Sequence, residues 1–405
     1  MTIKKSYRQS SKKRNYKLLT PEYATFRSEI LEYIEPKEFK KPTILLDPMA
    51  GTAPLIPLIE INGHKAYFND ILPLHGYINK AKTYDIYETY NKHGYDWFFQ
   101  QLVKCMSQLK GKRLYISEKP IEEDILAGLI KAWHAVEEYD SKNATLLKAV
   151  ILVCVRPLSS ITKTENPTWF KAGGMSSGKD LQEIIKESLM KFHNYYSFSY
   201  NSKPVIKRGT CIITTQSVDK FRPQEKVNLI ITSPPYCNRM DYKATYRPEN
   251  YFLAAAGEPV HESNLIGTTM VKDYKTLEDD YTYLTRRSAY AKRLLDKVKN
   301  SKNRDDPVYY FKYYTRYFAM VTRGIIDSVQ NLLPSGKMYI VTQDNVHRGQ
   351  MIEIDTILRE LLGASGWQSR IVKKWERSHL GLRNISREHA LVKPKQFEKM
   401  LVIWQ

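Results

Sequence analysis

The sequence predicts an α/β fold with a mostly parallel sheet and a largely helical insertion. Short apolar runs alternate with helical patterns in two separate blocks, residues 41–84 and 206–405, as strands joined by crossover helices do. Residues 85–205 lie between the blocks and carry helical patterns without a sheet pattern. The length of 405 residues also exceeds that of most single domains, which favours a core carrying an additional module.

Seven segments, most of them short apolar runs, are expected to form the strands of the sheet. In chain order they are Thr43–Leu46, Lys65–Asn69, Cys211–Thr215, Asn228–Thr232, Lys337–Thr342, Ser369–Trp375 and Met400–Trp404. Their short length and apolar character are typical of buried strands.

Three runs inside the insertion favour helices or burial. Ile121–Glu137 and Leu181–Phe192 have amphipathic helical spacing. Leu146–Val155 is almost continuously apolar, so we expect it to be buried, but it is too short to span a membrane. Further along, residues 242–306 are polar and charged, and we expect this segment to carry loops.

The chain is strongly basic. Its 63 Lys and Arg residues against 43 Asp and Glu give a net charge of +20, a self-repulsion that a polyanion such as nucleic acid relieves. Residues 1–40, expected to form a basic arm and a lead-in helix, suit either a phosphate contact or a solvated tail. The four cysteines form no CxxC pair and no HExxH occurs, so we expect neither a metal site nor disulfides. No signal peptide is evident, and a cytoplasmic, nucleoid-associated location is expected.

A turn of small residues follows the first expected strand. It reads Asp-Pro-Met-Ala-Gly-Thr-Ala over residues 47–53, and Gly51 lets a ligand approach the backbone closely. The second strand leads into Asp70, where a carboxylate can accept both hydroxyls of a ribose. Neither GxxxxGK[ST] nor GxGxxG is present, which disfavours a triphosphate or a dinucleotide. The adenosine and amino-acid parts of S-adenosyl-L-methionine fit better. Gly51 and Asp70 are the two residues that this reasoning places at the cofactor.

The strand over residues 228–232 ends abruptly in Ser-Pro-Pro-Tyr. Its two prolines remove two N–H donors and leave carbonyl oxygens free to face a ligand. The Ser233 hydroxyl and the Pro234 carbonyl can accept the two protons of an exocyclic amino group, while Tyr236 stacks on the base. A proline-rich turn without function is the alternative interpretation.

The two segments, DPMAGTA and TSPPY, together resemble the first and fourth motifs of the amino-group, SPPY-type DNA methyltransferases that use S-adenosylmethionine. The resemblance implies a class I methyltransferase fold, which is Rossmann-like with a mostly parallel seven-stranded sheet. It implies that the turn and the acid after the second strand hold the cofactor, through Asp47, Pro48, Ala50, Gly51, Thr52 and Asp70. It also implies that the tetrapeptide grips a flipped base. The residues concerned are Ser233, Pro234, Pro235 and Tyr236. Because the SPPY form is most typical of N4-cytosine enzymes, cytosine N4 is favoured over adenine N6.

The chain departs from the family pattern in the cofactor motifs. Met49 stands where Phe is usual and Ala53 where Gly is usual, which changes the pocket for the methionine part of the cofactor. After the third strand the family often has an acid for the adenine ring, and Gln216 is expected to make that hydrogen bond here. Cys237 follows the tetrapeptide, but amino methylation requires no thiolate, so we expect no catalytic role for it.

Residues expected to contact DNA lie in two segments. Asn238 and Arg239 follow the tetrapeptide, where a flipped nucleotide needs a clamp; an ordinary surface turn is the alternative. Lys163, Trp169 and Lys171 lie in one part of the insertion with a composition suited to a DNA-facing loop. Packing in the interior is the alternative for Trp169.

The sequence therefore predicts an enzyme, a site-specific cytosine-N4 DNA methyltransferase of a prokaryotic or phage restriction-modification system. Its expected partners are double-stranded DNA and a cognate restriction endonuclease. Residues 85–205 are the candidate target-recognition module, between the cofactor block 41–84 and the catalytic block 206–405. The alternatives are adenine N6 in DNA, a base in tRNA or rRNA, and, ranked last, a DNA-binding protein without activity. RNA and protein methyltransferases usually begin the tetrapeptide with Asn, so Ser233 counts against them.

Overall fold

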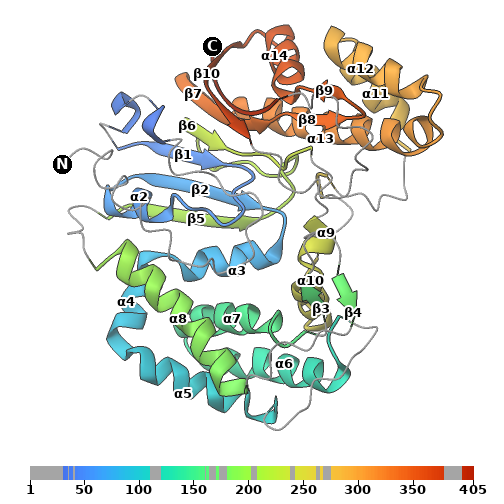
Figure 1. The fold of residues 1–405 in the computed structure, drawn as a ribbon. Coiled ribbons are helices and arrows are strands. Elements are labelled where there is room, and N and C mark those ends of the chain that lie inside the picture. The colour runs from blue at the N-terminus through green and yellow to red at the C-terminus, as the bar shows by residue number, and fades with distance from the viewer. Residues whose placement is uncertain are drawn as a thin grey trace. The chain divides into compact units, whose positions relative to one another are not determined.

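The chain adopts an α/β fold, shown in a computed structural model (Figure 1). The structure describes residues 31–34, 36–39, 42–109, 120–159, 161–163, 170–172, 180–201, 208–237, 242–260, 265–267, 275–377 and 395–405. The chain divides into two compact units. The described part of unit 1 falls within residues 50–216 and 243–262, and that of unit 2 within residues 29–49, 217–242 and 263–405.

The seven strands predicted from the sequence all form. They are β1 (Ile44–Asp47), β2 (Lys65–Asp70), β5 (Thr210–Thr215), β6 (Val227–Thr232), β7 (Leu332–Gln343), β10 (Gln368–Arg377) and β11 (Gln396–Trp404). The sheet order is β10-β11-β7-β6-β1-β2-β5. Pairing is parallel for β1 with β6, β6 with β7 and β2 with β5, and antiparallel for β11 with both β7 and β10. The predicted mostly parallel, Rossmann-like sheet is confirmed.

Unit 1 joins β2 and β5 to the largely helical insertion that the sequence predicts. Its helices include α2 (Ile56–Ile61), α3 (Pro73–Ala81), α4 (Tyr84–His93), α5 (Tyr95–Cys105), η3 (Ser107–Leu109), α6 (Glu123–Ala135), η4 (Val136–Glu138), α7 (Ser141–Val155) and α8 (Leu181–Ser199). Figure 1 shows α3 between β5 and α7. The approach of α3 to β5 requires Gly76, because a Cβ there would lie 2.4 Å from the Thr215 Oγ1 atom.

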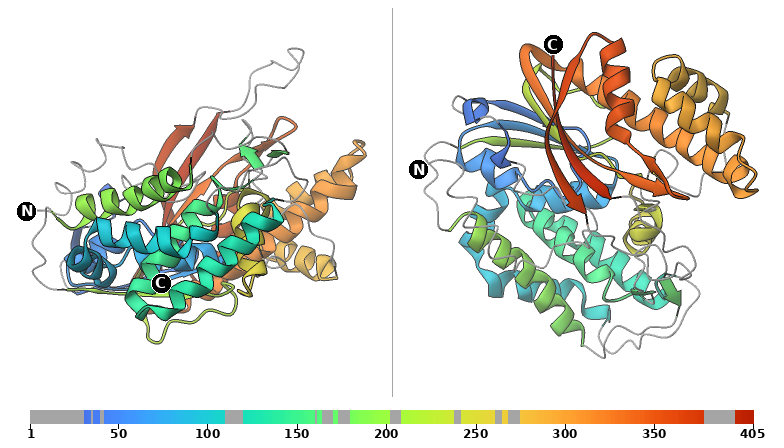
Figure 2. Two further views of the ribbon diagram at one scale, coloured as in Figure 1. Left: turned by 90° about the horizontal axis from the view of Figure 1, so that it is seen from below. Right: turned by 45° about the horizontal axis from the view of Figure 1, so that its top comes forward.

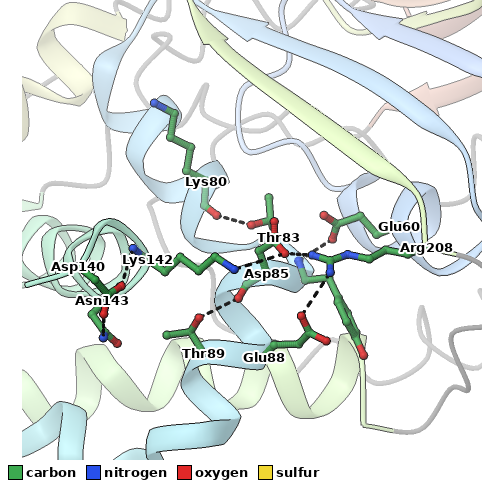
Figure 3. Close-up of polar contacts among 11 residues, drawn as sticks. Glu60, Lys80, Thr83, Asp85, Glu88, Thr89, Asp140, Lys142, Asn143 and Arg208 are labelled. Atoms are coloured by element: carbon green, nitrogen blue, oxygen red, sulfur yellow. Dashed lines mark hydrogen bonds and ion pairs between the residues drawn. The ribbon is translucent and has the colours of Figure 1, made fainter.

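The apolar run predicted to be buried forms most of α7. Apart from Lys148, its residues from Leu146 to Val155 are at most 6% exposed. The helix begins where the Asp140 carboxylate accepts the Lys142 and Asn143 N–H groups at 3.0 and 3.1 Å, a capping arrangement that satisfies free backbone donors (Figure 3). Within the described residues, no helix combines the length and the apolar character that crossing a membrane requires.

Polar contacts fix both ends of the insertion to the rest of unit 1 (Figure 3). Arg208, just before β5, forms an ion pair with Asp85 on α4. Nearby, Glu60 on α2 is buried, and its Oε2 atom accepts hydrogen bonds from the Tyr84 N–H at 2.8 Å and from the Tyr200 hydroxyl at 2.7 Å. The start of α4 and the end of α8 therefore meet on one buried carboxyl group.

Unit 2 surrounds its strands with further helices. They include η2 (Pro36–Phe39), η6 (Asp306–Tyr310), α13 (Phe311–Val329) and α14 (Ile354–Ala364). Helix α14 packs beside β7 and β10 (Figure 2). A hairpin of β8 (Asn345–His347) and β9 (Gln350–Ile352) follows β7 and was not predicted. Residues 1–30, most of the expected basic arm, lie outside the described part of the chain.

The expectation that residues 242–306 carry loops is wrong over much of the segment. It contains α9 (Tyr242–Thr245), α10 (Arg247–Ala255), α11 (Leu277–Thr285) and α12 (Ala289–Lys299). Ser288 caps α12 by accepting the Ala291 N–H at 2.9 Å. Leu294, Leu295 and Val298 then form a buried stripe between exposed charged residues. The high charge belongs to the solvent-facing side of amphipathic helices.

Candidate functional site

The turn after β1 is held in unit 1 by hydrogen bonds to its backbone. The Ala50 N–H donates to the Asn69 carbonyl at 2.8 Å. The Gly51 N–H donates to the Asp70 Oδ2 atom at 2.8 Å, and the Asn79 side chain donates to the Gly51 carbonyl at 2.8 Å. The Lys82 ammonium donates to the carbonyl of the following residue, Thr52. The end of β2 and helix α3 therefore fix the conformation of this turn.

Asp70, the last residue of β2, supports the turn that follows β1. Its Oδ1 atom accepts the Leu72 N–H at 2.9 Å and lies 3.1 Å from the His75 Nδ1 atom. Burial by itself raises the pKa of Asp70, but His75 and the N–H groups of Leu72 and Gly51 outweigh it, so the pKa lies below its ordinary value. The side chain is 15% exposed. A carboxylate is thus pre-positioned where the sequence places the ribose acceptor, although it already accepts two backbone donors.

Gln216 lies beside Asp70, because β2 and β5 pair with Asp70 opposite Thr215. The Gln216 N–H donates to the Asp70 carbonyl at 3.1 Å. The buried Asn69 amide adds two contacts, donating to the Gln216 carbonyl at 3.0 Å and accepting the Gln216 N–H at 3.2 Å. The Gln216 side chain remains exposed. Asn69 was not predicted as part of the site; the signal was a polar residue at the end of a buried strand.

The turn leaves open space for a ligand at Gly51. This residue has a φ of 51°, which favours glycine, and no heavy atom of the described residues lies within 4 Å of where its Cβ would be. Ala53, where the family usually has Gly, has a φ of 41°, a left-handed conformation that explains the usual Gly. Small residues, a partly exposed carboxylate and an exposed amide at one sheet edge fit a nucleoside with a polar tail.

Asp47 has a different role from the rest of the predicted cofactor set. It is 4% exposed, and its Oδ1 atom accepts the Thr232 hydroxyl at 2.8 Å and the Met49 N–H at 3.2 Å. Within unit 2, Asp47 therefore joins the end of β1 to the end of β6, directly before Ser233. Pro48, which follows, is also buried.

Hydrogen bonds hold the tetrapeptide at its second proline, Pro235, and also hold Cys237, the residue that follows the tetrapeptide. The Tyr317 hydroxyl on α13 donates to the Pro235 carbonyl at 2.6 Å. The Asn345 side chain donates to the Cys237 carbonyl. Burial raises the pKa of Tyr317 well above its usual value, so this donor stays neutral. In the described part of the chain, no donor reaches the Pro234 carbonyl, which remains available as an acceptor.

A chain of hydroxyl groups links the tetrapeptide to β11. The Ser233 hydroxyl donates to the Tyr236 hydroxyl at 3.3 Å, and Tyr236 donates to the Glu398 Oε1 atom at 2.8 Å. Glu398 is 1% exposed and was not predicted as a site residue. The signal was an acidic residue close before the apolar run Met400–Trp404. Tyr236 is itself 5% exposed, so stacking of a base on its ring stays a prediction.

Cys237 has the environment of a structural thiol. It is 1% exposed, and burial raises the pKa of its thiol far above the ordinary value. A nucleophilic cysteine requires the opposite shift, toward a thiolate. The geometry therefore gives no support to a covalent mechanism at this position.

The predicted DNA-contacting residues are only partly described. Asn238, Arg239 and Trp169 lie outside the described residues. Lys163 ends strand β3 (Ile161–Lys163) and Lys171 lies in β4 (Phe170–Ala172), an antiparallel hairpin in which Lys163 pairs with Phe170. The expected loop thus includes a hairpin, whose side chains are also outside the described part.

Three carboxylates in unit 2 lie close enough together to resemble a cation site. They belong to Asp344, Glu353 and Asp355. The Lys399 ammonium lies among them, at 2.9, 2.8 and 2.9 Å from their oxygens. Burial lowers the pKa of Lys399, but these carboxylates outweigh it and hold the pKa above its ordinary value. The cluster is therefore a buried ion-pair network around a lysine.

Comparison with known proteins points in the same direction as the motifs. No family model matches the chain. The chain is 25% identical over 419 residues to type II methyltransferase M.AvaI of Nostoc sp., covering 93% of this chain and 82% of that protein, and equally similar to M.AvaI of Anabaena variabilis. These relatives are methyltransferases. A third, type II methyltransferase M.BsoBI of Geobacillus stearothermophilus, is 24% identical over 306 residues, covering 66% of this chain and 59% of that protein.

Proposed function

We propose that this protein is an S-adenosylmethionine-dependent DNA methyltransferase that modifies an exocyclic amino group, with cytosine N4 favoured over adenine N6. The observation that carries the proposal is the end of β6, where the Ser233 hydroxyl adjoins the Pro234 carbonyl, which no donor among the described residues reaches. The similarity to type II methyltransferases over 93% of the chain supports it independently.

The cofactor is assigned to the turn after β1 and to the neighbouring strand ends. Gly51 offers open space beside the backbone, Asp70 offers an ionised carboxylate and Gln216 an exposed amide. Pro48, Ala50 and Thr52 complete the turn. Asp47 is 4% exposed and bonded to Thr232 and Met49, so it would contribute by holding the start of the turn beside the end of β6. When bound, S-adenosylmethionine supplies the electrophilic methyl group.

The base is assigned to the tetrapeptide. The Ser233 hydroxyl oxygen and the Pro234 carbonyl oxygen would each accept a hydrogen bond from one N–H of the amino group. This arrangement keeps the nitrogen lone pair directed at the methyl group. Pro235 fixes the backbone through its bond with Tyr317, and Tyr236 would contact the face of the base. Positioning and hydrogen bonding suffice for this reaction, so no covalent intermediate is required.

Double-stranded DNA is the proposed substrate. The base would be flipped out of the duplex to reach the tetrapeptide, and the phosphates of the duplex would attract a chain of net charge +20. The insertion would read the target sequence, with Lys163, Trp169 and Lys171 near the DNA and Asn238 and Arg239 near the flipped nucleotide. The name type II of the relatives suggests a restriction-modification system with a partner endonuclease, in the cytoplasm.

One experiment separates this function from its alternatives. Labelled S-adenosylmethionine is incubated with the protein and separate pools of duplex DNA, single-stranded DNA, tRNA and rRNA, with Ser233→Ala as the matched impaired control. We expect label in duplex DNA and not in the other pools, and its incorporation should be about tenfold or more slower with Ser233→Ala. Label confined to tRNA or rRNA would make the enzyme an RNA methyltransferase, and no label in any pool would contradict the proposal.

A further inference from the structure

We propose that Glu398 is a positioning residue that sets the direction of the hydrogen bonds at Ser233, so that the Ser233 oxygen acts as an acceptor toward the substrate amine. The inference rests on the proposed function. It comes from the continuous series Ser233, Tyr236 and Glu398, whose oxygens are separated by 3.3 and 2.8 Å.

The direction of this series follows from the proton inventory of each group. A carboxylate has no proton to donate, so Tyr236 must give its single hydroxyl proton to Glu398. The Tyr236 oxygen can then only accept, and the Ser233 hydroxyl donates to it. With its one proton committed, the Ser233 oxygen has only lone pairs left for a ligand.

The opposite direction would impair amine methylation. If Tyr236 donated to Ser233 instead, the Ser233 proton would be free to point at the amine nitrogen. A hydrogen bond donated to that nitrogen occupies the lone pair that has to attack the methyl group. Glu398 prevents this arrangement without touching the substrate.

The position of Glu398 suits a fixed orienting group. It lies in β11, which pairs with β7 on one side and β10 on the other, and it stands opposite Gln343 and Trp375 in the two registers. The side chain is 1% exposed, so water does not compete for its bond with Tyr236. Burying a carboxylate on a strand inside the sheet costs free energy, and the hydrogen bond from Tyr236 offsets part of that cost. We attribute the presence of Glu398 to this bond.

The test is a double-mutant cycle with Glu398→Gln and Tyr236→Phe. Glutamine keeps the size of the side chain but can also donate a proton, and phenylalanine keeps the ring for stacking while removing the linking hydroxyl. Single-turnover methylation of duplex DNA is measured for both single variants and the double variant, together with dissociation constants for cofactor and DNA. The matched control is Glu376→Gln on β10, whose side chain is exposed and paired with Lys395.

We expect each single variant to methylate about tenfold to a hundredfold more slowly, with both dissociation constants within about twofold of the unaltered protein. The double variant should be no slower than the slower single variant, because Glu398 acts only through the Tyr236 hydroxyl. Effects that multiply in the double variant, or a Glu398→Gln variant as fast as the Glu376→Gln control, would overturn the inference. If Glu398→Gln did not fold, an unimpaired Tyr236→Phe would still refute it. Lack of methylation by the unaltered protein would instead refute the proposed function.

Discussion

Replacing Asp70 by asparagine tests the cofactor assignment at its most constrained group. In the folded protein the two carboxylate oxygens accept the Gly51 and Leu72 N–H groups at 2.8 and 2.9 Å. An asparagine side chain has one acceptor oxygen, so one of the two N–H groups must face an amide NH2 instead. The variant loses a hydrogen bond that holds the cofactor turn, and it also loses the charged acceptor assigned to the ribose. We therefore expect cofactor binding to weaken by about 1–3 kcal/mol, roughly tenfold to a hundredfold. Asp70→Ala should cost more, about 2–4 kcal/mol, since both acceptors are removed.

The assay is isothermal titration of S-adenosylmethionine into the purified variants, with melting temperatures measured in parallel. Asp96→Asn, an exposed aspartate on α5, is the matched control and should leave both quantities unchanged. The depressed pKa of Asp70 means that its contribution is present above the ordinary value of 3.8 and is lost only below it. Affinity should therefore not fall between about pH 8 and pH 5 through this group. Unchanged affinity in both Asp70 variants would refute the assignment.

Three further outcomes are expected. DNA binding should weaken steeply between about 50 and 200 mM salt, measured by fluorescence anisotropy, and a flat response would mean that the positive charge serves another purpose. Burial raises the pKa of Glu60 from 4.5 to about 7. The stabilisation that the protonated carboxyl contributes to the fold is therefore complete below pH 4.5 and is lost as the pH rises through about 7. Glu60→Gln should therefore raise the free energy of unfolding at pH 8 by up to about 3 kcal/mol and change little at pH 4.5; an equal effect at both pH values would contradict this. Finally, Cys237→Ser should methylate normally, whereas Ser233→Ala and Tyr236→Ala should lose about tenfold or more in single-turnover rate with cofactor affinity kept, and the reverse pattern would require a covalent mechanism.

The sheet could be predicted because its signal is local. Most of the strands appear in the sequence as short apolar runs, and all seven predicted segments form strands within two residues of the predicted start, except β7 and β11, which begin at Leu332 and Gln396. In β7, Pro334, Ser335 and Gly336 separate the two leading leucines from the apolar run, and in β11, Gln396, Glu398 and Lys399 precede it, so both runs begin later than the strands. The short hairpins, β3 with β4 and β8 with β9, have three residues per strand and leave no pattern to recognise.

The segment 242–306 shows the limit of reading composition alone. Its charge suggested loops, yet α12 places Leu294, Leu295 and Val298 on one face and its charged residues on the other. Helical spacing within a charged segment was the better signal than the overall polarity.

The motifs marked the right places but not how each residue is held there. Asp70 and Tyr236 stand at strand ends, as predicted, but their partners His75 and Glu398 come from a helix and from a strand 162 residues away. The contact of Tyr236 with Glu398 depends on the packing of elements distant in sequence, which no local pattern encodes. Asp47 is the clearest case, since its buried bond to Thr232 joins two strands that only the folded sheet makes neighbours.

The central claim is that the end of β6 directs a methyl group to an amino nitrogen. Its most direct measurement is mass spectrometry of nucleosides from duplex DNA methylated by the protein with a deuterated methyl donor. The account predicts N4-methylcytosine carrying the label, and about tenfold less, or lower still, from the Ser233→Ala variant in the same short reaction time. Label on N6 of adenine would keep the amino chemistry and change the base. Label on carbon 5 of cytosine, or full labelling by Ser233→Ala, would contradict the account.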